Sequence, residues 1–87
     1  MRLPLIKNLV NFIEKNDEDF LNETIETLEF LTESDTLKDE EIDVVGELLS
    51  NIYGALEVQK SIKNGTSQKE ALNEFMSRVL GSIDKSK

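Results

Sequence analysis

The chain has 87 residues with 18 acidic and ten basic side chains, which gives a net charge of −8, and it contains neither cysteine nor histidine. This length corresponds to one domain of marginal stability, and because disulfides are excluded and a zinc site would need carboxylates alone, a second subunit is the expected source of support. The composition also excludes the usual nucleophile–base arrangements, and the acidic surface disfavours nucleic acid and membranes as partners.

No segment alternates with period two and the only proline is Pro4, so the sequence predicts an all-α fold. A first helix is expected over about residues 4–15, with Pro4 in its first turn. One face of this helix is apolar at about 100° per residue. The residues of that face are Leu5, Ile6, Leu9, Val10, Phe12 and Ile13.

A second helix is expected over about residues 18–32, with Asn16 and Asp17 as its N-cap. The residues expected to be buried are Phe20, Leu21, Thr24, Ile25, Leu28 and Leu31, and the outer face carries Glu23, Glu26, Glu29 and Glu33. Phe30 projects among these glutamates. It is a candidate contact for a protein partner, although it can equally fold over Leu37 in the following loop.

A third helix is expected over about residues 38–63, starting from a capping box of Thr36 and Asp39 and ending at Asn64 and Gly65. Its length is about 38 Å, whereas the other helices are nearer 20 Å. Its apolar arc spans about 180°, which is too wide for one neighbouring helix. The arc contains Ile42, Val44, Val45, Leu48, Leu49, Ile52, Tyr53, Ala55, Leu56 and Ile62.

The third helix is therefore either the long central helix of a monomeric bundle or an interface helix. We favour a helical bundle completed by an antiparallel two-fold homodimer. The expected seam consists of Val45, Leu49, Ile52 and Leu56. Gly46, Ser50 and Gly54, spaced four apart, let two helix backbones approach closely, which offsets the helix-propensity cost of the two glycines.

A fourth helix is expected over about residues 67–82, with Ser67 and Glu70 as its capping box. The residues expected to be buried are Ala71, Leu72, Phe75, Met76, Val79, Leu80 and Ile83. The charge along the chain is uneven, since residues 1–55 hold fourteen acidic and four basic residues, whereas residues 56–87 hold four and six. This polarity can steer the acidic part toward the basic one, within or between subunits, but we favour solvated helix faces with a mild bias in charge.

One carboxylate pattern has metal-binding spacing: Glu23 and Glu26 form E-x-x-E, and Glu40 and Asp43 form E-x-x-D on the next helix. The pattern resembles the magnesium-binding motif of all-α nucleoside triphosphate pyrophosphohydrolases of the MazG type. The resemblance implies that these four residues bind Mg²⁺. We favour solvated helix faces, because no basic residue accompanies the motif to hold a phosphate.

Residues 47–57 (ELLSNIYGALE) and 64–75 (NGTSQKEALNEF), together with Leu3 and Pro4, resemble a small family of uncharacterised bacterial proteins of about this length. This resemblance implies no activity and no functional residues. The start of the chain lacks the long apolar core of a signal peptide, and no apolar run reaches transmembrane length, so a cytoplasmic location is expected.

The first functional hypothesis is a non-enzymatic homodimeric module that presents an acidic face to a protein partner, with no cofactor and no small-molecule substrate. The alternative is a magnesium-dependent nucleotide hydrolase that uses the four carboxylates. A DNA-binding regulator is disfavoured, because the fourth helix sets only Lys69 and Arg78 against Glu70 and Glu74.

Overall fold

The computed structural model describes residues 2–85, with side chains up to Val79. Four helices account for nearly all of this part of the chain: α1 (Leu3–Lys15), α2 (Asp19–Thr32), α3 (Asp39–Lys63) and α4 (Gln68–Lys85). No strand occurs among the described residues. The all-α prediction is confirmed, and each helix begins and ends within three residues of its expected position.

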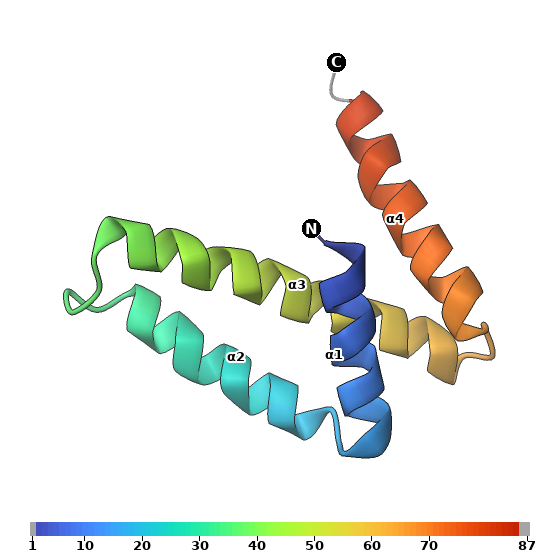
Figure 1. The fold of residues 1–87 in the computed structure, drawn as a ribbon, viewed down its shortest axis with the longest axis horizontal. Coiled ribbons are helices and arrows are strands. Elements are labelled where there is room, and N and C mark those ends of the chain that lie inside the picture. The colour runs from blue at the N-terminus through green and yellow to red at the C-terminus, as the bar shows by residue number, and fades with distance from the viewer. Residues whose placement is uncertain (1, 86–87) are drawn as a thin grey trace.

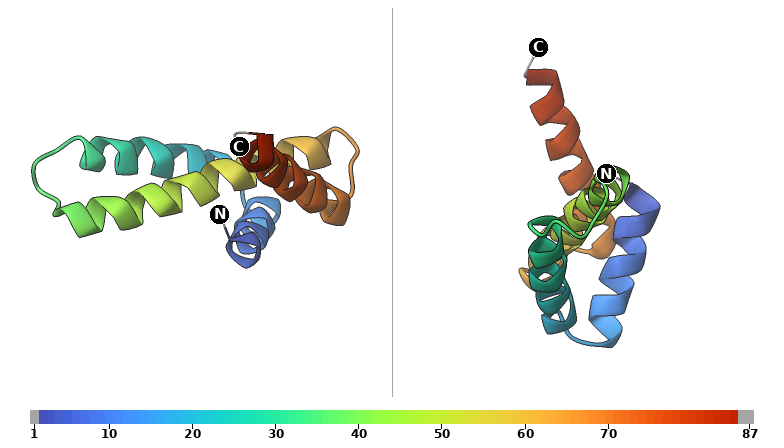
Figure 2. Two further views of the ribbon diagram at one scale, coloured as in Figure 1. Left: turned by 90° about the horizontal axis from the view of Figure 1, so that it is seen from above. Right: turned by 90° about the vertical axis from the view of Figure 1, so that its left-hand side faces the viewer.

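The helices form an open, flat arrangement that measures 42 × 39 × 18 Å. The longest helix, α3, contacts α1, α2 and α4. Figure 1 shows α2 running antiparallel beside α3 and α1 crossing α3 near its middle. After the turn that follows α3, α4 leads away from α2 and α3, as Figure 1 and the right-hand view of Figure 2 show.

The core lies where α1 crosses α3 and where α4 begins. The buried apolar residues are Ile6, Val10 and Ile13 of α1, Leu21 and Ile25 of α2, Leu49, Ile52, Ala55 and Val58 of α3, and Ala71, Leu72 and Phe75 of α4. Met76 and Val79 are half-buried beside them. The expected core positions Leu80 and Ile83 lie outside the residues whose side chains are described. On α3, every buried residue lies at Leu49 or later in the chain.

A buried amide fixes the crossing of α1 over α3. The side chain of Asn51 is fully buried. Its Oδ1 accepts a hydrogen bond from the backbone N–H of Arg2 at 2.9 Å, and its Nδ2 donates to the carbonyl of Glu47 at 2.8 Å. Both polar atoms of the amide therefore have partners, as burial requires.

The helix ends confirm the expected caps at Ser67 and Gly65 but not the N-cap of α2. The backbone N–H of Glu70 donates to Ser67 Oγ. The N-cap of α2 is Glu18 instead of Asn16 or Asp17, although Asp17 Oδ1 accepts a hydrogen bond from the N–H of Asp19. At the end of α3, Gly65 has φ of +106°, and its N–H bonds to the carbonyl of Ile62. The N–H of Thr66 bonds to the carbonyl of Ser61. These two bonds form a Schellman motif, which ends α3 where the sequence predicts.

The predicted capping box of Thr36 and Asp39 is wrong. α3 begins one residue after Lys38, whose backbone N–H donates to the carboxylate of Glu41 at 2.9 Å. Thr36 Oγ1 instead bonds to Ser34 Oγ at 2.6 Å within the loop. The reason is that the N3 glutamate can accept from any backbone N–H at the N-cap position, so this half of the box needs no particular N-cap side chain.

Three residues expected in the core are exposed: Phe12, Phe20 and Thr24. The rings of Phe12 and Phe20 meet edge to face with their centroids 5.9 Å apart. α1 crosses α3 instead of running along α2 (Figure 1), so α2 buries only the side that faces α3. Leu21 and Ile25 lie on that side, and the two phenylalanines cover each other at the turn between α1 and α2.

Candidate functional site

The expected seam residues of α3 are divided between the core and the surface. Leu49, Ile52 and Gly54 are buried against this chain's own helices. Val45 and Leu56 are half-buried beside the core, and Gly46 is half-buried while Ser50 is exposed. In the described chain, a Cβ placed on Gly46 would meet no atom within 4 Å. No described residue therefore approaches the backbone closely at Gly46.

An apolar strip on the first half of α3 is left partly exposed in the described chain. Val44 is 58% exposed and Leu48 is 39% exposed. Residues spaced by three and four share one face of a helix, so the strip continues into Asn51 and Ala55, which are fully buried. α1 covers this face of α3 only as far back as Asn51, where the backbone N–H of Arg2 at the start of α1 makes its hydrogen bond. We call Val44 and Leu48 the open strip.

Acidic residues surround the open strip. They are Asp39, Glu40, Glu41, Asp43 and Glu47. Glu47 pairs with Arg2 at 3.5 Å, but both side chains are more than half exposed, and such pairs contribute between about 0 and 1 kcal/mol. A partner for the open strip must therefore bring apolar area and must keep its own acidic groups away from these residues.

Two further exposed aromatic residues, Phe30 and Tyr53, differ in their surroundings. Phe30 is 69% exposed on α2, as expected for a residue among glutamates. Tyr53 is 45% exposed, and its hydroxyl donates to Glu29 Oε2 at 2.6 Å. This hydrogen bond to a carboxylate raises the pKa of Tyr53 above its ordinary value, with smaller contributions from desolvation and from the charge of Glu29. Tyr53 thus connects α3 to α2.

The four carboxylates of the magnesium hypothesis are all exposed: Glu23, Glu26, Glu40 and Asp43. Among the residues that the structure describes, no group of three or more carboxylates is placed to hold a metal ion. The spacing along the chain therefore does not produce a cation site within one copy. The hydrolase hypothesis gains no support from this arrangement.

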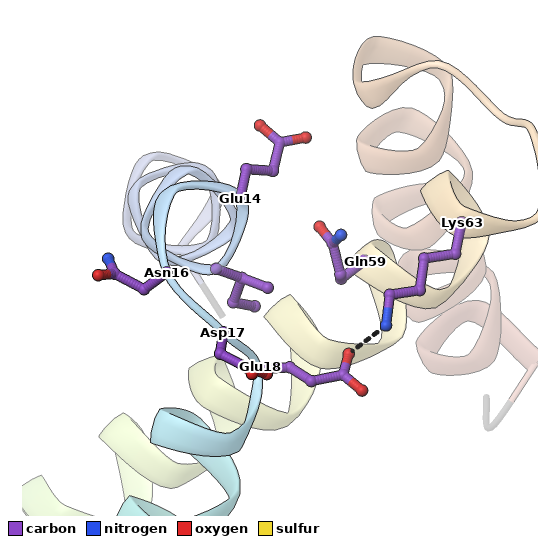
Figure 3. A pocket seen from close by; sticks show the side chains of 7 residues that line it. Glu14, Asn16, Asp17, Glu18, Gln59 and Lys63 are labelled. Atoms are coloured by element: carbon purple, nitrogen blue, oxygen red, sulfur yellow. Dashed lines mark hydrogen bonds and ion pairs between the residues drawn. The ribbon is translucent and has the colours of Figure 1, made fainter.

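A polar pocket of about 460 Å³ lies between the α1–α2 turn and the last turns of α3. Its lining consists of Ile13, Glu14, Asn16, Asp17, Glu18, Gln59 and Lys63. Lys63 Nζ donates to Glu18 Oε2 at 2.9 Å (Figure 3). Glu14 extends on the side that faces Gln59 and Lys63, whereas the side chain of Asn16 points the other way and donates to the carbonyl of Phe12.

Gln59 is the unusual residue of this pocket. Its side chain is 8% exposed, and its Oε1 has no hydrogen-bond partner among the described atoms. Gln59 is not among the candidate residues predicted from the sequence. The signal was available, because Gln59 follows the buried Ile52 by seven residues and so occupies an inward position of α3 with a polar side chain.

None of the helices in the described part of the chain is long and apolar enough to cross a membrane. A family model described as "Family of unknown function (DUF6952)" matches residues 1–84. No curated protein and no solved structure matches the chain. The family match covers nearly the whole sequence and confirms the expected membership of an uncharacterised family, but its description names no activity.

Proposed function

The chain belongs to the DUF6952 family of unknown function, and we propose that it is a non-enzymatic module that pairs with a second copy of itself through α3 and contacts other proteins. The observation that carries the proposal is the open strip. Val44 and Leu48 continue a face of α3 that is fully buried at Asn51 and Ala55. In the proposed dimer, the second copy supplies the missing cover.

The surface area of the chain supports this proposal. The accessible surface is 6162 Å², whereas a compact monomer of this mass has about 5,200 Å². The excess of about 1,000 Å² is close to the roughly 800 Å² that each partner buries in an interface of standard size. The radius of gyration is also large: 14.1 Å against about 12 Å for a compact domain of this length.

The charge distribution favours an antiparallel arrangement. Residues 1–55 hold fourteen acidic and four basic residues, and residues 56–87 hold four acidic and six basic ones. A parallel pair would place the acidic parts of both copies together, which is repulsive. An antiparallel pair that meets at the open strip sets the start of α3 in one copy opposite the middle of α3 in the other, which separates the two acidic starts. Phe30 on α2 is the proposed contact for a further protein.

The seam differs from the one expected from the sequence. Leu49 and Ile52 already pack inside one copy, so the proposed interface runs along the open strip together with the half-buried Val45 and Gly46. A charge introduced at Leu48 is expected to break the dimer without unfolding the chain, because Leu48 is 39% exposed in the single copy. A charge at Leu49 is expected to disrupt the fold itself.

The test is the solution mass of wild type, Leu48→Glu and Leu3→Glu by light scattering at two protein concentrations. Leu3 is the matched control, since it is an exposed leucine, at 38%, on α1. We expect twice 9.9 kDa for wild type and Leu3→Glu, and at least a tenfold weaker dimer for Leu48→Glu with unchanged helical circular dichroism. A wild-type monomer at both concentrations refutes the dimer, and a dimeric Leu48→Glu refutes this seam.

A further inference from the structure

A groove between the start of α1 and the start of α4 combines apolar surface with positive charge. It has a volume of about 330 Å³, and its lining consists of Leu3, Lys7, Gln68, Lys69, Leu72 and Asn73. Leu3 is more than a third exposed, whereas Leu72 belongs to the buried core. The groove therefore offers a small apolar surface between one lysine on α1 and one on α4.

The two helices hold the walls of this groove in place. Leu3 and Lys7 lie four residues apart on α1, so they share one face of that helix. A hydrogen bond from Gln68 Nε2 to Asn11 Oδ1, 3.0 Å long, joins the start of α4 to α1. The walls are thus positioned before a ligand arrives, which reduces the entropy lost on binding.

The charge of the groove is opposite to that of the whole chain. The chain carries a net charge of −8, yet the lining contains two lysines and no acidic residue. Among the described residues, no ion pair engages Lys7 or Lys69. The acidic residues Glu70 and Glu74 of α4 are not part of the lining. An acidic group at the groove therefore meets two cations, whereas a basic group is repelled.

This combination of groups selects an occupant that is both apolar and acidic. An inorganic anion would leave Leu3 uncovered, and a purely apolar group would leave both lysines without a counter-charge. A nucleic acid is disfavoured because its many phosphates would also meet the acidic surface around the groove. The volume lies near the lower end of the range of about 300–1,000 Å³ for binding pockets, which suits one apolar side chain and the groups beside it.

We propose that the groove between α1 and α4 binds an acidic segment of another protein, with an apolar side chain on Leu3 and Leu72 and carboxylates at Lys7 and Lys69. The amide of Asn73 carries a donor and an acceptor that match a peptide backbone. The groove lies on other helices than the open strip, so the inference goes beyond the proposed pairing of two copies and does not depend on it.

The test titrates the protein at low ionic strength with a blocked peptide that has one leucine between two glutamates on each side. The backbone amide signals of Lys7, Gln68 and Leu72, followed by ¹⁵N NMR, are expected to show saturable shifts. Peptides with serine in place of the leucine, or with glutamine in place of the glutamates, are expected to bind about tenfold more weakly. Because the whole chain is acidic, general electrostatic attraction does not produce binding of this peptide.

Lysine variants separate the groove from other positive charge on the surface. Lys7→Gln with Lys69→Gln is expected to weaken peptide binding about tenfold, because it removes both counter-charges. Lys15→Gln with Lys60→Gln removes the same charge from two exposed positions outside the groove and is expected to change the affinity by less than about twofold. Equal losses in the two double variants would overturn the proposal.

Two leucine variants separate the groove from the open strip. Leu3→Glu is expected to abolish peptide binding with the mass of the protein unchanged, and Leu48→Glu is expected to leave peptide binding intact. A monomeric wild type that binds the peptide would refute the dimer and support the groove. The groove proposal fails if no saturable shift occurs, if the serine or glutamine peptide binds equally well, or if N-acetyl-leucine does, since a small apolar carboxylate would then be the ligand.

Discussion

The two halves of α3 carry the same kind of apolar pattern but have very different surroundings. Residues 39–48 contain no buried side chain, although Val44, Val45 and Leu48 lie among them. Residues 49–63 include every buried residue of the helix, because α1 crosses here and α4 begins nearby. Periodicity in the sequence thus predicts which face of a helix is apolar, whereas the burial of that face depends on which other helices pack against it and over what length.

The largest effect expected from this comparison is on stability. Ile52→Ala, in the covered half, should lower the free energy of unfolding by about 2–5 kcal/mol, because Ile52 is 7% exposed. Val44→Ala, in the open half, should change that of the single copy by less than about 0.5 kcal/mol. Urea unfolding followed by circular dichroism, at two protein concentrations, measures both.

In the proposed dimer, the effect of Val44→Ala grows with protein concentration, because association adds to the stability of the folded chain. The effect of Ile52→Ala remains large at both concentrations. If the two variants lowered the free energy of unfolding equally in dilute solution, residues 39–48 would be as well covered as residues 49–63. That result would contradict the difference between the two halves of α3.

A second, smaller effect concerns two glycines, one in the open half of α3 and one just after its end. Gly46→Ala should stabilise the single copy by up to about 1 kcal/mol, because its Cβ meets no atom within 4 Å. Gly65→Ala also has free space, but its φ of +106° is strained for alanine, so it should cost about 1–2 kcal/mol. Thermal unfolding in dilute solution compares them.

Gly46→Ala also tests the close approach expected from the sequence. If a second copy packs against the backbone at Gly46, the added methyl group should weaken the dimer while it stabilises the single copy. The affinity of the dimer, measured by light scattering, would then fall, whereas the melting temperature in dilute solution would rise. A variant that is more stable and equally dimeric would show that the small residue at this position has no role in pairing.

The smallest expected effect is at high pH and concerns Tyr53, which ties the covered half of α3 to α2. The hydrogen bond to Glu29 raises the pKa of Tyr53 above its ordinary value of 10.0. The stability from this bond is therefore fully present below pH 10 and is lost as the pH rises through the raised pKa. Tyr53 is the only tyrosine, so its absorbance near 295 nm reports this titration alone.

Glu29→Gln should lower the midpoint of that titration toward the ordinary value, because it removes both the charge and the charged acceptor. Glu33→Gln, on the same face of α2, serves as the control and should leave the midpoint unchanged. A wild-type midpoint at the ordinary value would show that the contact between Tyr53 and Glu29 is not maintained in solution.

The helices and their ends were predictable because they depend on local chemistry. Pro4, Ser67 and Gly65 act within a few residues of their own position, so the sequence contains what determines each helix end. Lys38 escaped prediction because its backbone, instead of its side chain, makes the capping bond. The exposure of Phe12 and Phe20 escaped prediction because it depends on the crossing direction of α1, which no local pattern records.

The candidate sites were less predictable for a related reason. The arc of α3 indicated an uncovered surface, but the sequence placed the seam on Leu49 and Ile52, which one copy already buries. The choice between Leu48 and Leu49 depends on where α1 stops. Gln59 became a candidate only when its surroundings were visible, since a single glutamine in an amphipathic helix ordinarily faces solvent.

The buried amide of Asn51 has a consequence for the uniqueness of the fold. Apolar surfaces are non-directional, so α1 alone could slide by one turn along α3 and still bury Ile6, Val10 and Ile13. The amide permits only one register, because a shifted α1 would leave Asn51 Oδ1 without the N–H of Arg2. Replacement of Asn51 by leucine would preserve the helices but allow α1 to pack on α3 in more than one register. Asn51 thus favours one alignment of α1 on α3, and this alignment determines where α1 stops covering α3.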